Sequence, residues 1–332
     1  MYYPNYRNKI LKGGIIMLKF QPDYTTSISC FEEFFITVYV LIDDLYQQYV
    51  PESVSTRRNA KNSKTTDSES ITISLCGEIA GIDSQNAWYA FVKKNYGFLF
   101  PNLCSRTRFH RRHKALLQVM ELLREKTLCF FQIESDSFGI VDSFPFPICK
   151  FARAPVLRTF SSDDVSFDAT YGYYASKKET YFGYKVHALI TFDGVIKTLE
   201  LTSASVDDRK ALPDLVENQG KLVILGDKGY VSQSLKETLV NEGITLLALP
   251  RSNSKEAFQS SIRKMIVKQR RKIGTVFSQW NDQFHMEHVL AKSFYGLCSR
   301  LVTKIFGYNL CLLLNSMFSA IAESSKIKQL IY

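Results

Sequence analysis

The sequence lacks most of the short motifs that indicate a cofactor or a compartment. It has no CxxC pair, and its seven cysteines are scattered and odd in number, which is typical of reduced thiols in a cytosolic protein. It contains no P-loop and no GxGxxG fingerprint, so neither kind of nucleotide site is indicated. It also has no apolar run of about 18 residues and no signal peptide, so neither a membrane span nor secretion is expected.

The few histidines form no metal motif either. Cys104, His110 and His113 lie close together, but their spacing fits no zinc pattern. His285, Glu287 and His288 give H-x-E-H, which is not the HExxH helix of metalloproteases. We interpret both groups as ordinary polar positions.

The length, composition and net charge are those of a globular chain with an excess of positive charge. The 332 residues suffice for about two domains, and 45% of them are hydrophobic. The formal net charge of +10 favours a polyanionic partner such as nucleic acid. Cationic membrane-surface proteins share this excess, but the absence of a long apolar run argues against a membrane.

The first third of the chain reads as helical. Residues 1–30 are expected to form a loose leader, and Met17 is an alternative start to Met1. Residues 31–49 predict a helix that Pro51 ends, and the polar, Ser/Thr-rich residues 52–70 predict an exposed linker.

Residues 105–126 are the densest basic stretch, and helical apolar spacing follows. Its basic residues are Arg106, Arg108, Arg111, Arg112 and Lys114. The stretch is either a solvated helix face or a contact surface for DNA phosphates.

From about residue 130 the pattern changes to α/β. One strand is predicted to end at Asp142, and residues 181–202 predict a hairpin with a two-residue turn at Asp193-Gly194. A helix, a buried strand at 222–225, a second helix at 232–243, a further strand and helices over 261–314 follow. We therefore expect an all-helical domain followed by an α/β domain.

Asp142 and Asp227 both follow apolar strands. A carboxylate after a buried strand is either a turn residue or a site residue, and for Asp227 the turn is the plainer alternative. Open α/β sheets, however, place ligands at such strand ends. Two carboxylates held together there would bind a hard divalent cation, and such ions catalyse phosphoryl transfer on nucleic acids.

Five segments together resemble the DDE transposases of bacterial insertion sequences. They are IVDSFPFPICKFARA (140–154), YFGYKVHALITFDG (181–194), LTSASVDDRKAL (201–212), LGDKGYVS (225–232) and RRKIGTVFSQW (270–280). The resemblance implies a ribonuclease-H-like mixed sheet flanked by helices at 129–315, a helical DNA-recognition region at 31–128, and a tail at 316–332. It implies Mg²⁺, with Mn²⁺ as a substitute, bound by the catalytic residues Asp142 and Asp227.

The resemblance also implies the partners. The chain would bind the terminal inverted repeats of its element and the target DNA, as a homodimer on the nucleoid in the bacterial cytoplasm. The residues expected to contact DNA are Arg106, Arg108, Arg111, Arg112, Lys228 and Arg270.

One expected acid is missing, because Gly274 stands where the family has its third catalytic residue, a glutamate. Asp282 and Glu287 lie about 12 and 20 Å further along a helix, too far to replace it. Asp207 and Asp208 are more simply explained as a helix N-cap and an acid in the first turn. The sequence thus predicts a transposase that Gly274 has inactivated or, alternatively, a non-catalytic DNA-binding remnant.

Overall fold

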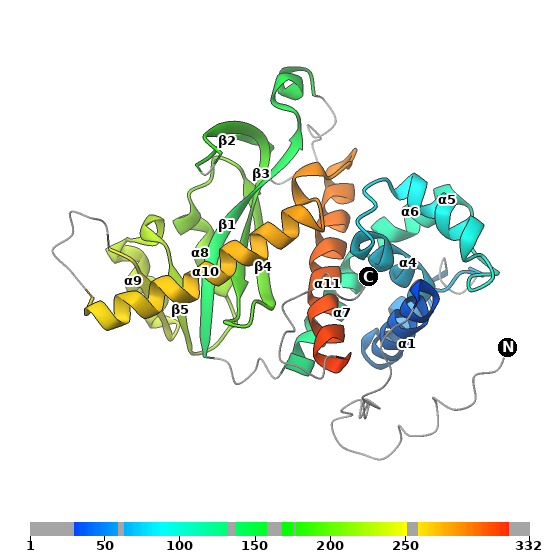
Figure 1. Ribbon diagram of the computed structural model, residues 1–332, viewed down its shortest axis with the longest axis horizontal. Coiled ribbons are helices and arrows are strands. Elements are labelled where there is room, and N and C mark those ends of the chain that lie inside the picture. Colours follow the sequence, from blue (N-terminus) through cyan, green and yellow to red (C-terminus); the bar gives the residue numbers. More distant parts are fainter. Residues whose placement is uncertain are drawn as a thin grey trace, which may run out of the picture.

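The computed structural model describes residues 30–58, 63–131, 137–157, 168–175, 177–250 and 258–318. Nearly all of the predicted leader, 1–30, and most of the predicted tail, 316–332, lie outside these ranges. In the described part, a group of helices lies beside a sheet with helices of its own (Figure 1).

The first part of the chain is helical, as predicted from its apolar spacing. Helix α1 (Phe31–Tyr49) buries seven side chains that recur every three or four residues, so one face of the helix packs inward. Leu116 divides the predicted basic helix into two. The other helices of this part are α2 (Glu52–Ser55), α4 (Asp67–Ile79), α5 (Gln85–Asn95), α6 (Arg106–Ala115) and α7 (Leu117–Leu128).

The predicted exposed linker, 52–70, is wrong at its C-terminal end. Its last four residues open α4, where Asp67 and Ser70 are buried. The Thr66 hydroxyl accepts a hydrogen bond from the Glu69 amide at 3.0 Å, and the Glu69 carboxylate accepts one from the Thr66 amide at 2.6 Å. The Ser/Thr-rich composition here therefore reflects a capping box at a helix start.

The sheet has six strands, five of which follow the order β4–β3–β1–β5–β6. β1, β3 and β4 are antiparallel neighbours, whereas β5 and β6 run parallel to β1. The bounds are β1 (Phe138–Cys149), β2 (Thr170–Tyr174), β3 (Glu179–Ile190), β4 (Ile196–Ser203), β5 (Leu222–Gly226) and β6 (Ile244–Ala248). This order and direction are those of a ribonuclease-H-like sheet, so the predicted fold class is confirmed.

Two details of the sheet differ from the prediction. β2, which was not predicted, pairs with the first residues of β3, beyond the end of β4. The predicted hairpin of β3 and β4 exists, but its turn is longer than two residues. The Thr191 amide donates to the Val195 carbonyl at 2.9 Å, and the Gly194 amide donates to the Thr191 carbonyl at 3.1 Å.

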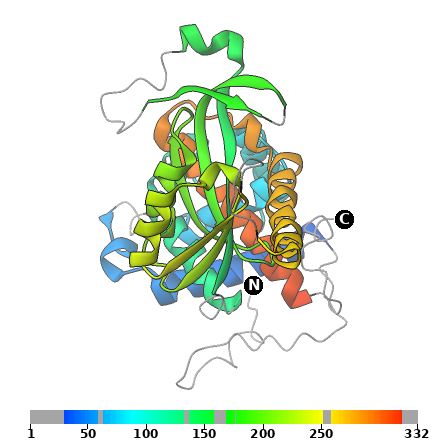
Figure 2. The same cartoon turned by 90° about the vertical axis from the view of Figure 1, so that its left-hand side faces the viewer.

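Helices cover both faces of the sheet (Figure 2). α8 (Asp208–Val216) and α9 (Gln233–Asn241) share a hydrophobic cluster with Val141 of β1. α10 (Ser260–Asp282) packs on the other face, where Phe277 meets Phe144 with ring centroids 5.3 Å apart. Side chains of a strand alternate between its faces, so Asp142 points toward α10 and Ser143 toward α8.

The last helix, α11 (Phe294–Phe318), changes the predicted domain division. It lies against α4 and α7 (Figure 1), and one hydrophobic cluster runs from α1 through α11 to β1. The predicted catalytic domain, 129–315, therefore shares its last helix with the predicted helical region, 31–128. Phe294–Met317 is long and apolar enough to cross a membrane, but 89% of the most apolar window is buried inside the fold, as in a core helix.

A buried ion network ties α11 to the rest of the molecule. Glu78 of α4 accepts contacts from Arg300 Nε at 2.8 Å and Lys304 Nζ at 2.7 Å. Lys304 also donates to the carbonyl of Phe284, just after α10. Burial lowers the pKa of Lys304, and the charge of Glu78 opposes that effect. Glu78 therefore helps buried Lys304 to remain charged in the interior.

We expect Glu78→Gln to lower the free energy of unfolding by about 3 kcal/mol, because it leaves two buried cations without their counter-charge. Urea denaturation measures this. The matched control is Asp207→Asn, which weakens an exposed ion pair with Arg209 and keeps a good N-cap. Its effect should stay below about 1 kcal/mol, and equal losses in both variants would contradict the role of the network.

Candidate active site and basic surface

Asp142 lies inside β1, so the predicted end of the strand at this residue is wrong. β1 continues to Cys149 because its pairing with β3 extends from Ile140 to Cys149. Its parallel pairing with β5, however, ends at the pair Ile140–Leu225. Asp142 therefore lies just past the last β1–β5 pair, beside the C-terminal end of β5.

Asp227 follows β5 directly, as predicted, and its side chain is engaged in a turn. Oδ1 accepts the Gly229 amide at 2.6 Å, and Asp227 caps the short 3-10 helix η4 (Lys228–Tyr230). The turn interpretation is thus confirmed. The same turn holds the carboxylate at the sheet edge that it shares with Asp142.

The Asp142 carboxyl lies in an environment that disfavours its charge. Its pKa is raised from 3.8 to about 6, first by burial and then by the negative charges of Asp227 and Asp208. The Ser143 amide, 2.9 Å from Oδ1, and Arg270, whose Nη2 lies 3.5 Å from Oδ2, oppose this rise. The side chain is 30% exposed, so the crowded carboxyl still has an open side.

Asp208 is a neighbour of the site, although the sequence predicted for it only a place at the start of a helix. The N-cap is Asp207, whose carboxylate accepts the Arg209 amide at 2.9 Å. Asp208 instead accepts hydrogen bonds from Lys185 Nζ at 2.8 Å and from Ser143 Oγ at 3.0 Å. Lys185 belongs to the segment YFGYKVHALITFDG (181–194), one of the five that carry the family resemblance. That resemblance was the sequence feature that could have pointed to this contact.

Tyr230 lies close to all three carboxylates. Burial raises its pKa well above the ordinary value, and the charges of Asp208, Asp142 and Asp227 raise it further. Within the described residues, its buried hydroxyl has no hydrogen-bond partner. Three acids and an unpaired hydroxyl therefore converge at one edge of the sheet.

Gly274 lies on the exposed side of α10, one turn after Arg270. A Cβ built there meets no heavy atom within 4 Å, so the fold has no steric need for glycine at this position. The glycine also weakens the helix, by roughly 1 kcal/mol relative to alanine. Nothing in the structure explains its presence.

The donor set suits a divalent cation but is incomplete. Carboxylate oxygens are the ligands that Mg²⁺ prefers, and a cation between Asp142 and Asp227 would relieve the repulsion that adds to the effect of burial on the pKa of Asp142. Among the described residues, however, no group of three histidine, cysteine or acidic side chains is close enough to hold a metal ion. The resemblance predicted a third acid at position 274, where the chain has Gly274.

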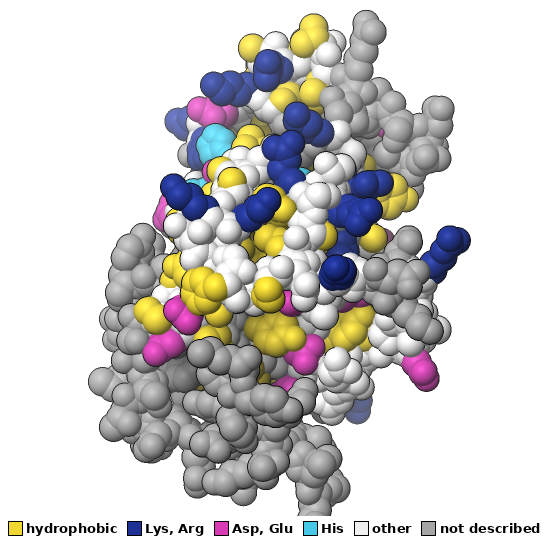
Figure 3. Space-filling view, turned by 90° about the vertical axis from the view of Figure 1, so that its right-hand side faces the viewer, with side chains coloured by type: hydrophobic (Ala, Val, Ile, Leu, Met, Phe, Trp, Pro, Cys, Tyr) yellow, Lys and Arg dark blue, Asp and Glu magenta, His cyan; other side chains and the backbone are white. Residues whose placement is uncertain are grey.

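The predicted DNA-contacting residues fall into two places. Lys228 is exposed and follows Asp227, and Arg270 contacts Asp142. The remaining four residues lie on α6, in the helical part (Figure 1). Figure 3 shows the side of the molecule on which the helical part lies, and Lys and Arg side chains gather over its upper part.

Arg112 does not belong to this exposed set, so its prediction as a DNA contact is corrected. Its Nε donates to Asp67 Oδ1 at 2.6 Å, and its side chain is only 12% exposed. Asp67 also accepts from the Tyr46 hydroxyl at 2.7 Å and pairs with Arg57 at 2.8 Å. Arg112 therefore balances a buried carboxylate, whereas Arg108 and Arg111 of the same helix are exposed.

Strand order and acidic edge together define a ribonuclease-H-like domain. Residues 133–294 match the family model described as transposase DDE domain. The match ends at Phe294, the first residue of α11, where the chain returns to the helical part. Residues 133–294 are therefore similar to transposase DDE domains, a kind of domain that generally depends on divalent metal.

No curated protein matches the chain. Among solved structures, a cryo-EM structure of a piggyBac transposase synaptic complex with hairpin DNA is similar, with a TM-score of 0.41 and 10% sequence identity. The similarity covers 89% of this chain and 79% of that one.

We expect Asp142→Asn to raise the melting temperature at pH 7.5 and to have little effect at pH 4. The folded chain binds this proton more tightly than the unfolded chain, so ionised Asp142 lowers stability as the pH rises from about 4 to about 6, and the loss persists above. The raised pKa corresponds to at most about 3 kcal/mol.

Thermal denaturation at the two pH values, with and without Mn²⁺, measures this effect. Mn²⁺ should stabilise the wild type at pH 7.5 and not at pH 4, and should not stabilise Asp142→Asn. Asp193→Asn, in the exposed hairpin turn, is the control and should leave both melting temperatures unchanged. An effect of Asp142→Asn that does not vary with pH would show that this carboxyl ionises alike in the folded and unfolded chains.

Proposed function

We propose that this chain is the transposase of a bacterial insertion sequence. It binds the terminal inverted repeats of the element, cuts DNA at the element ends, and joins the freed 3′-hydroxyl ends to target DNA. The observation that carries the proposal is the convergence of Asp142 and Asp227 at one edge of the sheet in a transposase DDE domain. The active species is a homodimer on the nucleoid in the bacterial cytoplasm.

The site residues have distinct roles in this proposal. Asp142 and Asp227 would hold Mg²⁺, or Mn²⁺ in its place, and the metal would supply Lewis-acid activation of the phosphodiester and of the attacking oxygen. Asp142 must lose its proton to bind a cation, so its raised pKa makes binding weaker below about pH 6. Lys185 balances Asp208, and Lys228 and Arg270 bind the phosphates of the cut strand.

A second candidate function is that of a non-catalytic remnant that binds element ends without cutting them. Gly274 is the observation that favours it, because the donor set is one acid short. Both candidates predict DNA binding, and they differ only in cleavage. The substrate for a cleavage assay comes from the DNA that flanks the gene, because inverted repeats there would define the element ends.

We expect Gly274→Glu to raise metal-dependent cleavage of end-bearing DNA by at least about 100-fold, because a missing metal ligand costs orders of magnitude in rate. The open space at Gly274 admits the longer side chain, and Arg270 one turn away can pair with it. The measurement is cleavage with Mg²⁺ or Mn²⁺, the wild type beside the variant.

The matched control is Gly274→Gln, which has the same size and similar helix propensity but no carboxylate. It should stabilise α10 by up to about 1 kcal/mol, as Gly274→Glu does, and should not raise cleavage. Adding Asp142→Asn or Asp227→Asn to Gly274→Glu should abolish cleavage again. If the wild type cuts as fast as Gly274→Glu, position 274 is not the missing ligand.

We expect the double variant Arg108→Gln/Arg111→Gln to weaken DNA binding at constant fold. Each lost phosphate contact should reduce the slope of log affinity against log salt by about one. Arg112→Gln should differ, since it removes an internal partner of Asp67 and so lowers the melting temperature. Fluorescence anisotropy over a salt series separates the two, and an unchanged slope in the double variant removes the exposed face of α6 from the interface.

A further inference from the structure

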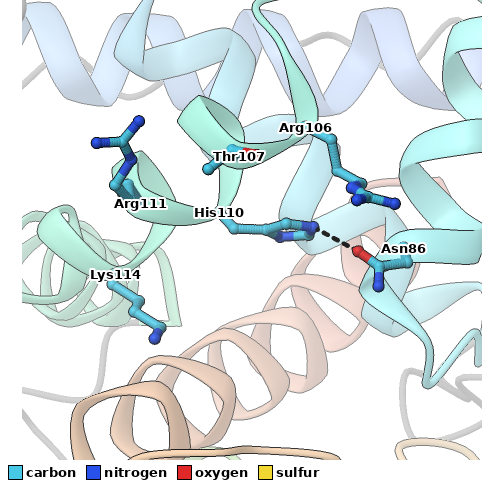
Figure 4. A pocket seen from close by; sticks show the side chains of 6 residues that line it. All are labelled: Asn86, Arg106, Thr107, His110, Arg111 and Lys114. Atoms are coloured by element: carbon cyan, nitrogen blue, oxygen red, sulfur yellow. Dashed lines mark hydrogen bonds between the residues drawn. The ribbon is translucent and has the colours of Figure 1, made fainter.

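An open cleft of about 260 Å³ lies between α5 and α6, away from the acidic edge of the sheet. Its lining consists of Asn86, Arg106, Thr107, His110, Arg111 and Lys114 (Figure 4). None of these side chains is acidic, and three carry a full positive charge. The composition excludes a cation as ligand and indicates an anion.

Asn86 and His110 fix each other at the wall of the cleft. His110 Nε2 lies 3.0 Å from Asn86 Oδ1, and because an amide oxygen only accepts, the imidazole donates this hydrogen bond. The Asn86 amide group is therefore oriented with its two N–H donors away from His110. Figure 4 shows the Arg106 guanidinium beside this pair.

The cationic side chains of the cleft have no acidic partner among the described residues. Arg106 and Arg111 take part in no ion pair there, and the contact of Lys114 is a 3.3 Å hydrogen bond to the Ser293 hydroxyl. This contrasts with Arg112 on the same helix, which is paired with Asp67. The cleft thus presents charges that the fold leaves unbalanced.

The charge around His110 indicates the same ligand. Burial lowers the pKa of His110, and the positive charges of Arg106, Lys114 and Arg300 lower it further. The groups that face the imidazole are Asn86 from α5, Arg106 and Lys114 from α6, and Arg300 from α11, which is itself paired with Glu78. An anion in the cleft would offset these cations and favour protonation of His110.

We propose that the cleft between α5 and α6 is a phosphate-binding site that takes one phosphate of the DNA backbone. The donors are the Arg106 guanidinium, the Asn86 amide, the Thr107 hydroxyl and the Lys114 ammonium, a mixture that is common in contacts to DNA phosphates. The site deepens the proposed function and rests on it for the source of the phosphate. It gives roles to Asn86, Thr107, His110 and Lys114, which are not among the six residues that the sequence singled out as DNA contacts.

The test follows the His110 imidazole by NMR in the full chain across a pH series. His110→Gln, which can still donate to Asn86, identifies the signal among the five histidines by its loss. The titration is repeated with inorganic phosphate, with a duplex that carries the element end, and with an unrelated duplex. Anisotropy on the same samples reports DNA binding independently.

We expect both duplexes to raise the pKa of His110 by about one pH unit, and inorganic phosphate to do so only at much higher concentration. His288, which does not line the cleft, should not respond. Arg106→Gln/Lys114→Gln should abolish the response and reduce the salt slope of DNA binding by about one. Lys94→Gln, an exposed lysine of α5 outside the cleft, should preserve the His110 response.

Each outcome decides the proposal. A response to inorganic phosphate with none to bound duplex would show an anion site that DNA does not use, which overturns the proposal. DNA binding by anisotropy without any response of His110 would overturn it and leave the proposed transposase function intact. If no duplex binds, the proposed function fails, and a response to phosphate alone would again overturn the assignment to DNA.

Discussion

The crowding of carboxylates at the shared edge of β1 and β5 is the constraint that the surrounding side chains must meet. Asp142, Asp227 and Asp208 come from a strand, a turn and a helix start. Burial raises the pKa of Asp142 to about 6, and the charges of Asp227 and Asp208 add to that rise. Lys185 and Arg270 lie against them as counter-charges. A fold keeps such a cluster only where cations offset it, whether these are side chains or a bound metal.

The helical part supports this edge through α10. Phe277 and Trp280 hold the helix on Phe144, two residues along β1 from Asp142. Just past the end of α10, the Phe284 carbonyl accepts from buried Lys304, which α11 positions against Glu78. The register of α10 over the acidic edge therefore depends on contacts with α4 and α11, so the two predicted domains act as one folded unit.

Basic residues on one helix divide between the interior and the surface. Arg112 balances Asp67, whereas Arg106 and Lys114 line an open cleft and Arg108 is exposed. These residues differ little in sequence context, and the helix turns each of them toward different neighbours. Positive charge in a sequence predicts a polyanionic partner, but which arginine meets it depends on where the acids of the fold lie.

Most of the helices and strands, and the acids Asp142 and Asp227, could be predicted from the sequence. Period-2 and period-3.6 apolar patterns predicted α1, the hairpin of β3 and β4, and the buried strand before Asp227, since local patterns report which face is buried. The sequence also showed that Gly274 stands where the family resemblance predicts an acid. Four features required the tertiary structure. β1 continues past Asp142, and α11 joins the helical part. Residues 67–70 open a buried helix, and Asp208 contacts Lys185. Each of these depends on contacts between residues distant in the chain, which no local pattern records.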